Sequence, residues 1–141
     1  MKTLLAIGMA LFMFAACASK QNNNVNIEDY KWITETMNGE SVDQEEGRNM
    51  FIQFDKTAGK VNGKAACNRY FGTYELNGNN LKFSQMGSTR MACLNMDQET
   101  VFLKILQETT GFQIKDNKLV LMQDKKELAV LVREVEAGEQ E

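Results

Sequence analysis

Short runs of alternating apolar and polar residues, each bounded by turn-forming residues, constrain the fold of this chain more than any other feature. Met50, Ile52 and Phe54 recur at every second position, and residues 81–83 repeat the pattern. A period of two places such side chains on one face of a β-strand. The Asn-Gly pair at 77–78 precedes the second run and is a strong hairpin signal, although Asn79 and Asn80 predict a loop longer than two residues.

The remaining runs predict an antiparallel arrangement with one helix. Further strands are expected at residues 30–34, 60–66, 71–76, 112–114, 119–122 and 128–132, with a turn at Asn38-Gly39 and an acidic loop over 40–49. Helical spacing is found over residues 95–108, where Asn95 is a candidate N-cap and Gly111 is expected to mark the helix exit. One helix among about seven short strands predicts an α+β, mainly β fold, an antiparallel sheet or partial barrel packed against that helix.

The first residues have the three parts of a secretory signal. Lys2 is followed by an apolar stretch over residues 4–14, and Ala15-Ala16 precedes Cys17. The small residues before Cys17 resemble the lipobox of bacterial lipoproteins, in which cleavage before the cysteine leaves it to carry acyl chains such as palmitate. A plain signal cleaved nearby is the alternative. The predicted organisation is a signal peptide (1–16), a lipidated polar tether (17–27), a folded domain (28–133) and an acidic tail (134–141).

A lipid on Cys17 would attach the domain to a membrane of the bacterial cell envelope. The tether lacks an acidic run after Cys17, and we therefore expect an outer-membrane lipoprotein that faces the periplasm. The chain has 16 Lys and Arg against 19 Asp and Glu, a formal charge of −3. This balance argues against a nucleic-acid partner, which requires a basic stripe.

Export also decides how the other two cysteines are interpreted. If Cys17 is acylated, Cys67 and Cys93 remain as an even pair in an oxidising compartment, where a disulfide is expected. Two buried free thiols are the alternative. Because the chain has no histidine and too few cysteines for a zinc site, neither a metal nor a cofactor is expected.

The segment from residue 59 to 106 resembles the META domain family, which includes HslJ-like heat-shock lipoproteins. The run GKAACNRYFGTYELNGNNLKF, followed by STRMAC, carries the resemblance. The positions that match the family pattern are Gly63, Cys67, Asn68, Tyr70, Gly72, Tyr74, Thr89, Arg90, Met91, Ala92, Cys93 and Glu99. Many relatives have a proline shortly after the second cysteine, where this chain has Leu94-Asn95. The resemblance implies a small β-rich fold with one helix and a loose link to stress responses, without an enzymatic activity.

Candidate site residues lie beside the two inner cysteines. Asn68, Thr89 and Arg90 are a possible ligand-binding set, although Asn and Thr also satisfy backbone groups in irregular loops. The chain has no GxSxG elbow and no P-loop, and we therefore expect no enzyme. The sequence predicts a non-catalytic envelope module that is stress-protective or binds an envelope protein. A binder of an unidentified small molecule, using a barrel mouth or a sheet cleft, is the alternative.

Overall fold

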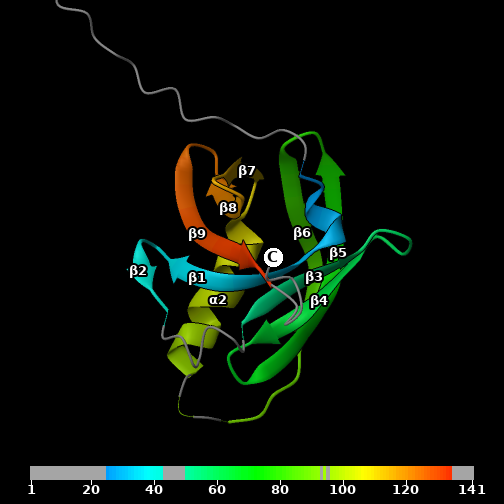
Figure 1. The fold of residues 1–141 in the computed structure, drawn as a ribbon. Coiled ribbons are helices and arrows are strands. Elements are labelled where there is room, and N and C mark those ends of the chain that lie inside the picture. The colour runs from blue at the N-terminus through cyan, green and yellow to red at the C-terminus, as the bar shows by residue number, and fades with distance from the viewer. Residues whose placement is uncertain (1–24, 43–49, 93, 95, 135–141) are drawn as a thin grey trace, which may run out of the picture.

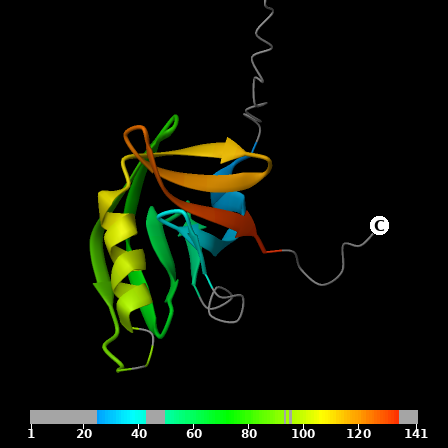
Figure 2. The same cartoon turned by 90° about the vertical axis from the view of Figure 1, so that its left-hand side faces the viewer.

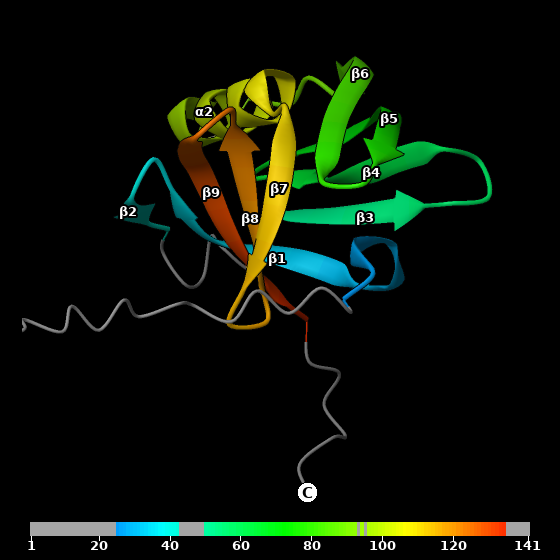
Figure 3. The same cartoon turned by 90° about the horizontal axis from the view of Figure 1, so that it is seen from above.

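The computed structural model describes residues 25–42, 50–92, 94 and 96–134. Nine strands form one antiparallel sheet in the order β2-β1-β3-β4-β5-β6-β7-β8-β9, and β1 also pairs with β9. This extra pairing closes the sheet into a ring, with one described helix packed along its side (Figures 1 and 3). The predicted fold class is therefore confirmed, with more strands than the sequence indicates.

The elements follow the chain in a simple order. A short 3-10 turn, η1 (Ile27–Asp29), comes first, and the helix α2 (Met96–Glu108) lies between β6 and β7. The strands are β1 (Lys31–Met37), β2 (Glu40–Ser41), β3 (Phe51–Asp55), β4 (Lys60–Ala65), β5 (Asn68–Asn77), β6 (Asn80–Ser88), β7 (Gly111–Lys115), β8 (Lys118–Gln123) and β9 (Lys126–Arg133).

Tight turns join neighbouring strands because asparagine, aspartate and glycine accept positive φ angles. Asn38 and Gly39 have φ of 50° and 82°, as a type I′ turn between twisted strands requires. In the β5–β6 hairpin Asn77 pairs with Asn80, and Gly78 has a φ of 59°. The loop therefore has two residues, and the longer loop expected from Asn79 and Asn80 is wrong. Asn80 already belongs to β6.

Apolar side chains fill the interior of the ring. Trp32, Ile52, Leu81 and Leu119 are all fully buried. The helix adds Phe102, Ile105 and Leu106 to this interior. The ring of Phe102 packs edge to face against the ring of Tyr70, with 5.9 Å between the centroids. Figure 2 shows α2 lying along one side of the strands, which is how these side chains reach the interior. Each such burial stabilises the fold by about 1.5–3 kcal/mol.

The start of the domain is anchored to the interior. Ile27 is 1% exposed, and its carbonyl oxygen accepts a hydrogen bond of 2.8 Å from the Trp32 indole. The Tyr74 hydroxyl donates to the carboxylate of Glu28. Burial, followed by this hydrogen bond, raises the pKa of Tyr74 above its usual value. The packed domain thus includes Ile27, which the sequence assigns to the tether.

Two local expectations are wrong, each for an identifiable reason. Residues 40–41 form β2 rather than part of a loop, because the turn at Asn38-Gly39 folds the chain back onto β1. Gly111 does not mark the helix exit. Thr109 occupies that place, since its hydroxyl donates to the carbonyl of Ile105. Within the part of the chain that the structure describes, no helix combines the length and apolar character needed to cross a membrane.

Candidate functional site

The ring is weakest between β6 and β7, and a hollow lies there. Asn80 and Gly111 form the single paired position between these strands. Two backbone hydrogen bonds hold them, from the Leu81 amide to the Thr110 carbonyl (3.3 Å) and from the Phe112 amide to the Asn79 carbonyl (2.9 Å). The strands diverge beyond this point because the β5–β6 hairpin ends in its turn while β7 continues to Lys115.

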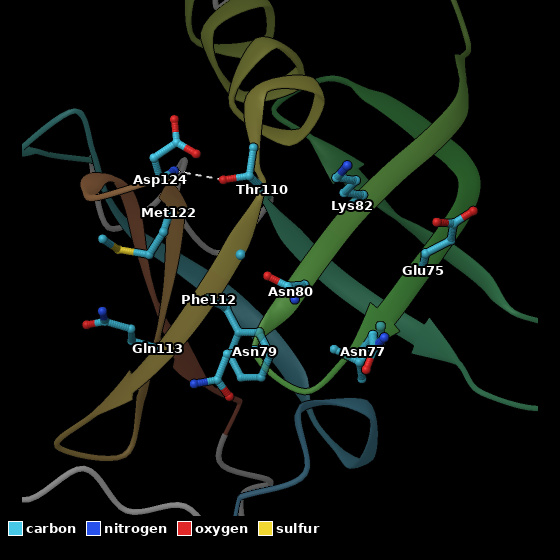
Figure 4. Close-up of a pocket in the computed structure, with 12 residues that line it drawn as sticks. Glu75, Asn77, Asn79, Asn80, Lys82, Thr110, Phe112, Gln113, Met122 and Asp124 are labelled. Atoms are coloured by element: carbon cyan, nitrogen blue, oxygen red, sulfur yellow. Dashed lines mark hydrogen bonds between the residues drawn. The ribbon is translucent and has the colours of Figure 1, made fainter.

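The hollow has a volume of about 690 Å³ and is open to solvent. Its walls come from the β5–β6 hairpin on one side and from β7 and the β8–β9 turn on the other (Figure 4). The lining residues are Glu75, Leu76, Asn77, Asn79, Asn80, Lys82, Thr110, Gly111, Phe112, Gln113, Met122 and Asp124. We call this site the seam hollow.

Gly111 is required where the two walls touch. A Cβ atom at this position would lie 2.9 Å from the Asn79 carbonyl oxygen, which is closer than real Cβ contacts. Only glycine lets β7 approach the hairpin turn this closely. The residue thus fixes the spacing of the two walls.

Four carboxamides give the seam hollow its polar character. The side chains of Asn77, Asn79, Asn80 and Gln113 line it, and none of them has a hydrogen-bond partner among the residues that the structure describes. Each carboxamide offers two N–H donors and one carbonyl acceptor. The hydroxyl of Thr110 also lines the hollow and accepts a bond of 2.7 Å from the Asp124 amide, drawn as a dashed line in Figure 4.

Charge in the seam hollow is sparse and nearly balanced. Lys82 lies opposite Glu75 in the β5–β6 register, and Asp124 lies on the far wall (Figure 4). Apolar surface comes from Leu76, Phe112 and Met122. The described residues contain no group of three or more cysteine, aspartate, glutamate or histidine residues placed to hold a metal ion. The residues that line the seam hollow therefore offer hydrogen bonds next to a small apolar surface.

Asn68, predicted as a ligand-binding residue, lies inside the protein. It is fully buried, and its side chain makes four hydrogen bonds. Its oxygen accepts from the Thr89 hydroxyl (2.8 Å) and the Met91 amide (2.7 Å). Its nitrogen donates to the Met91 carbonyl (3.0 Å) and to Glu99 (2.7 Å). The donors and acceptors of this amide are therefore all used within the chain.

Thr89 and Arg90 are exposed and follow directly after the end of β6. The Thr89 hydroxyl also accepts a hydrogen bond from the Arg69 amide at 3.2 Å. Asn68 and Thr89 thus tie β5 to the segment after β6, and Arg90 is not part of this network. A ligand-binding role for the three residues stays a prediction, and none of them lines the seam hollow.

Glu99 is the residue that joins this network to the helix. Its side chain is buried, and it accepts hydrogen bonds from the backbone amides of Cys67 (3.2 Å) and Asn68 (2.9 Å) besides the Asn68 side chain. Sequence reasoning placed Glu99 in the family pattern and in the first turn of the predicted helix, without this contact. Its position in the first turn of α2, where acidic residues also suit the helix dipole, hides this second role.

Two of the predicted cysteine sites lie outside the described residues, namely Cys17 and Cys93. Cys67 occupies the turn between β4 and β5. The disulfide between Cys67 and Cys93 and the lipid on Cys17 therefore stay predictions. The candidate N-cap Asn95 also lies outside the described residues.

Sequence reasoning did not identify the seam hollow. It interpreted the asparagines at 77, 79 and 80 as turn residues. A signal was present, because a two-residue turn with glycine in its first central position does not need three asparagines around it. The contribution of Gln113 and Met122 had no such signal, since only the closure of the ring places them opposite the hairpin.

A family model and solved structures of other proteins match nearly the whole of the described domain. The family model of the META domain matches residues 25–136. The NMR structure of a protein from Burkholderia xenovorans has a TM-score of 0.68 at 22% identity, covering 92% of this chain and 100% of that chain. A second NMR structure has a TM-score of 0.57 at 24% identity, covering 73% of this chain and 88% of the other. No curated protein matches this chain significantly.

Proposed function

The chain belongs to the META domain family, and on that premise we propose that it is a non-catalytic binding protein of the bacterial cell envelope, held at a membrane by lipid on Cys17. The anchor is supported by the signal pattern that ends at Ala15-Ala16-Cys17. Ile27, the first buried residue of the domain, lies ten residues beyond Cys17. Ten extended residues span at most about 35 Å, and the domain would therefore work close to the membrane surface.

The seam hollow is the observation that carries the binding function. The buried Asn68 side chain makes its four hydrogen bonds within the chain. In the hollow, by contrast, four carboxamides on strands and a tight turn have no hydrogen-bond partner among the described residues. Polar groups held on rigid elements bind a ligand without a large loss of conformational entropy. The sequence leaves open the binding of an envelope protein and the binding of a small molecule. These carboxamides favour a small ligand in a sheet cleft.

A protein partner is the second candidate, supported by a different surface. Met91 is 61% exposed and Leu94 is fully exposed, although both are apolar. They belong to the segment before α2, which lies at the end of the molecule away from η1 (Figures 1 and 2). Because the proposed anchor precedes η1, this segment would face away from the membrane. A stress-protective role, which the family suggests, fits either kind of binding.

The proposed disulfide between Cys67 and Cys93 is supported by the contacts on both sides of Cys93. Met91, two residues before it, exchanges two hydrogen bonds with the Asn68 side chain. Glu99, six residues after it, accepts from the Cys67 amide. Met91 and Glu99 are therefore bound to Asn68 and to Cys67, respectively, which supports the proposed bond.

The anchor is tested by the mass of the protein in its own membrane. Intact-mass analysis of the membrane fraction should give a chain that begins at Cys17 and carries acyl groups. Cys17→Ser should release the domain from the membrane or block processing. An unmodified, soluble product from the wild-type gene would refute the anchor.

The binding function is tested by filling the hollow. Native mass spectrometry of protein purified from its own envelope should show a bound small molecule in the wild type. Asn80→Trp places an indole in the seam hollow and should abolish that mass. Asn62→Trp is the matched control, because Asn62 is exposed on β4 outside the hollow and should keep the ligand. Equal ligand content in all three proteins would refute the proposed site.

A further inference from the structure

We propose that the ligand of the seam hollow is an uncharged glycan, an inference that rests on the proposed function and names its ligand class. The charges of the hollow are the first argument. Glu75 and Lys82 lie opposite each other, and Asp124 is the remaining charged group. A phosphate or sulfate ligand would require a cluster of cations or convergent backbone amides, and the hollow has one lysine with a carboxylate opposite it.

The hydrogen-bonding groups are the second argument. A sugar presents adjacent hydroxyls, each of which donates one hydrogen bond and accepts others. A carboxamide places an N–H donor and a carbonyl acceptor side by side, and it can therefore meet two neighbouring hydroxyls at once. Asn79 and Asn80 provide this pair of groups on the hairpin side, and Gln113 provides it on β7, where its side chain points away from the hairpin (Figure 4).

The apolar surface is the third argument. A sugar ring has a face of C–H groups that needs an apolar surface to lie against. Phe112 is half-buried in the seam, with its ring between the two walls in Figure 4. A lipid or other fully apolar ligand would need an enclosed apolar cavity, whereas the interior of the ring is filled by Trp32, Phe102 and their neighbours.

Size and access agree with a short chain of sugars. A volume of about 690 Å³ lies within the range of small-ligand sites, roughly 300–1,000 Å³. The hollow is open along the divergence of β6 and β7, and a longer glycan can therefore extend out of it. The structure thus assigns the site to a segment of an oligosaccharide.

The experiment uses the full chain in a zwitterionic detergent that has no sugar headgroup. Three neutral trisaccharides (maltotriose, cellotriose and chitotriose) and one anionic trisaccharide (trigalacturonate) are titrated while side-chain amide signals are followed by NMR. At least one neutral trisaccharide should shift the amide signals of Asn79, Asn80 and Gln113. The affinity should be insensitive to salt, because no ion pair is involved.

Two variants and a control separate recognition from stability. Asn80→Ala and Gln113→Ala should each weaken binding by roughly threefold to tenfold, the net effect of losing one or two hydrogen bonds. Asn62→Ala, an exposed amide on β4 outside the hollow, should bind like the wild type. Melting curves of all three variants show whether any loss comes from unfolding.

The outcomes distinguish this inference from the proposed function. If no neutral trisaccharide binds, or if trigalacturonate binds better, the proposal that the ligand is an uncharged glycan is refuted. The binding function then still stands when Asn80→Trp removes the ligand that copurifies with the wild type. If a trisaccharide shifts signals outside the hollow instead, the inference is overturned as well.

Discussion

Replacing Glu99 by alanine should lower the free energy of unfolding more than replacing any other charged residue of α2. Glu99 is 4% exposed and accepts three hydrogen bonds. Alanine removes the acceptor from all of them. The Asn68 backbone amide and side-chain nitrogen are buried, so no water can replace the lost carboxylate as their acceptor. Cys67 is half-buried, and its amide can bind water instead.

The magnitude follows from those two buried donors. A buried donor left without an acceptor costs about 1–3 kcal/mol, and two of them cost about 2–6 kcal/mol. Removing the carboxylate also removes the free-energy cost of burying it, which offsets part of this loss. We therefore expect the free energy of unfolding to fall by about 3 kcal/mol, equivalent to roughly 10 °C in Tm for a domain of this size.

Urea unfolding followed by circular dichroism measures this loss, with the m-value showing whether unfolding remains two-state. Glu108→Ala is the matched control, because Glu108 lies in the last turn of the same helix and, among the described residues, makes only an i,i+4 contact of 3.7 Å with Lys104. It should cost no more than about 0.5 kcal/mol. If Glu99→Ala costs as little as Glu108→Ala, the network does not hold the helix to the sheet and our reasoning fails.

Three further predictions concern other parts of the molecule. Burial raises the pKa of Tyr74, and the folded state therefore keeps its phenol proton when the unfolded chain has lost it. This contribution to the free energy of unfolding is complete below pH 10, the usual pKa, and declines as the pH rises above it. Tyr74→Phe should flatten that alkaline decline in urea titrations, and an unchanged slope would contradict the assignment. The double replacement Cys67→Ser, Cys93→Ser should lower stability by about 2–5 kcal/mol. Two free thiols in protein from the envelope, detected by labelling under denaturing conditions, would exclude the bond. Gly63→Ala should destabilise by about 2–3 kcal/mol, because its Cβ would run into the Phe51 carbonyl oxygen. A thermal melt unchanged from the wild type would contradict the packing at that point.

Local chemistry explains which features of the fold the sequence predicts. Two-residue alternation identifies β3 and β6, because an element with one face on a core must repeat apolar residues at its own period. The helix is identified for the same reason from Phe102, Ile105 and Leu106. Strand boundaries and the β5–β6 loop length are less well predicted, since cross-strand pairing decides how far each strand extends.

The candidate site, in contrast, cannot be predicted from the local sequence. Asn68 has the same chemistry as Asn80, and no local signal distinguishes them. Asn68 is buried with all its side-chain hydrogen bonds made, whereas the Asn80 side chain lines a hollow and has no partner in the described part of the chain. The difference comes from neighbours that are distant in sequence, namely Glu99 for one and Gly111 for the other.

The sequence alone thus determines the class of fold, the position of the helix and the resemblance to the META domain, because each depends on residues close together in the chain. Only the tertiary structure decides that the sheet closes through β1 and β9 and that the ring is weakest between β6 and β7. Closure brings residues 77–82 of the hairpin against residues 110–124, which start some thirty positions later. Contacts of that separation depend on strand order, register and the packing of α2, and these are properties of the assembled sheet and not of any one segment.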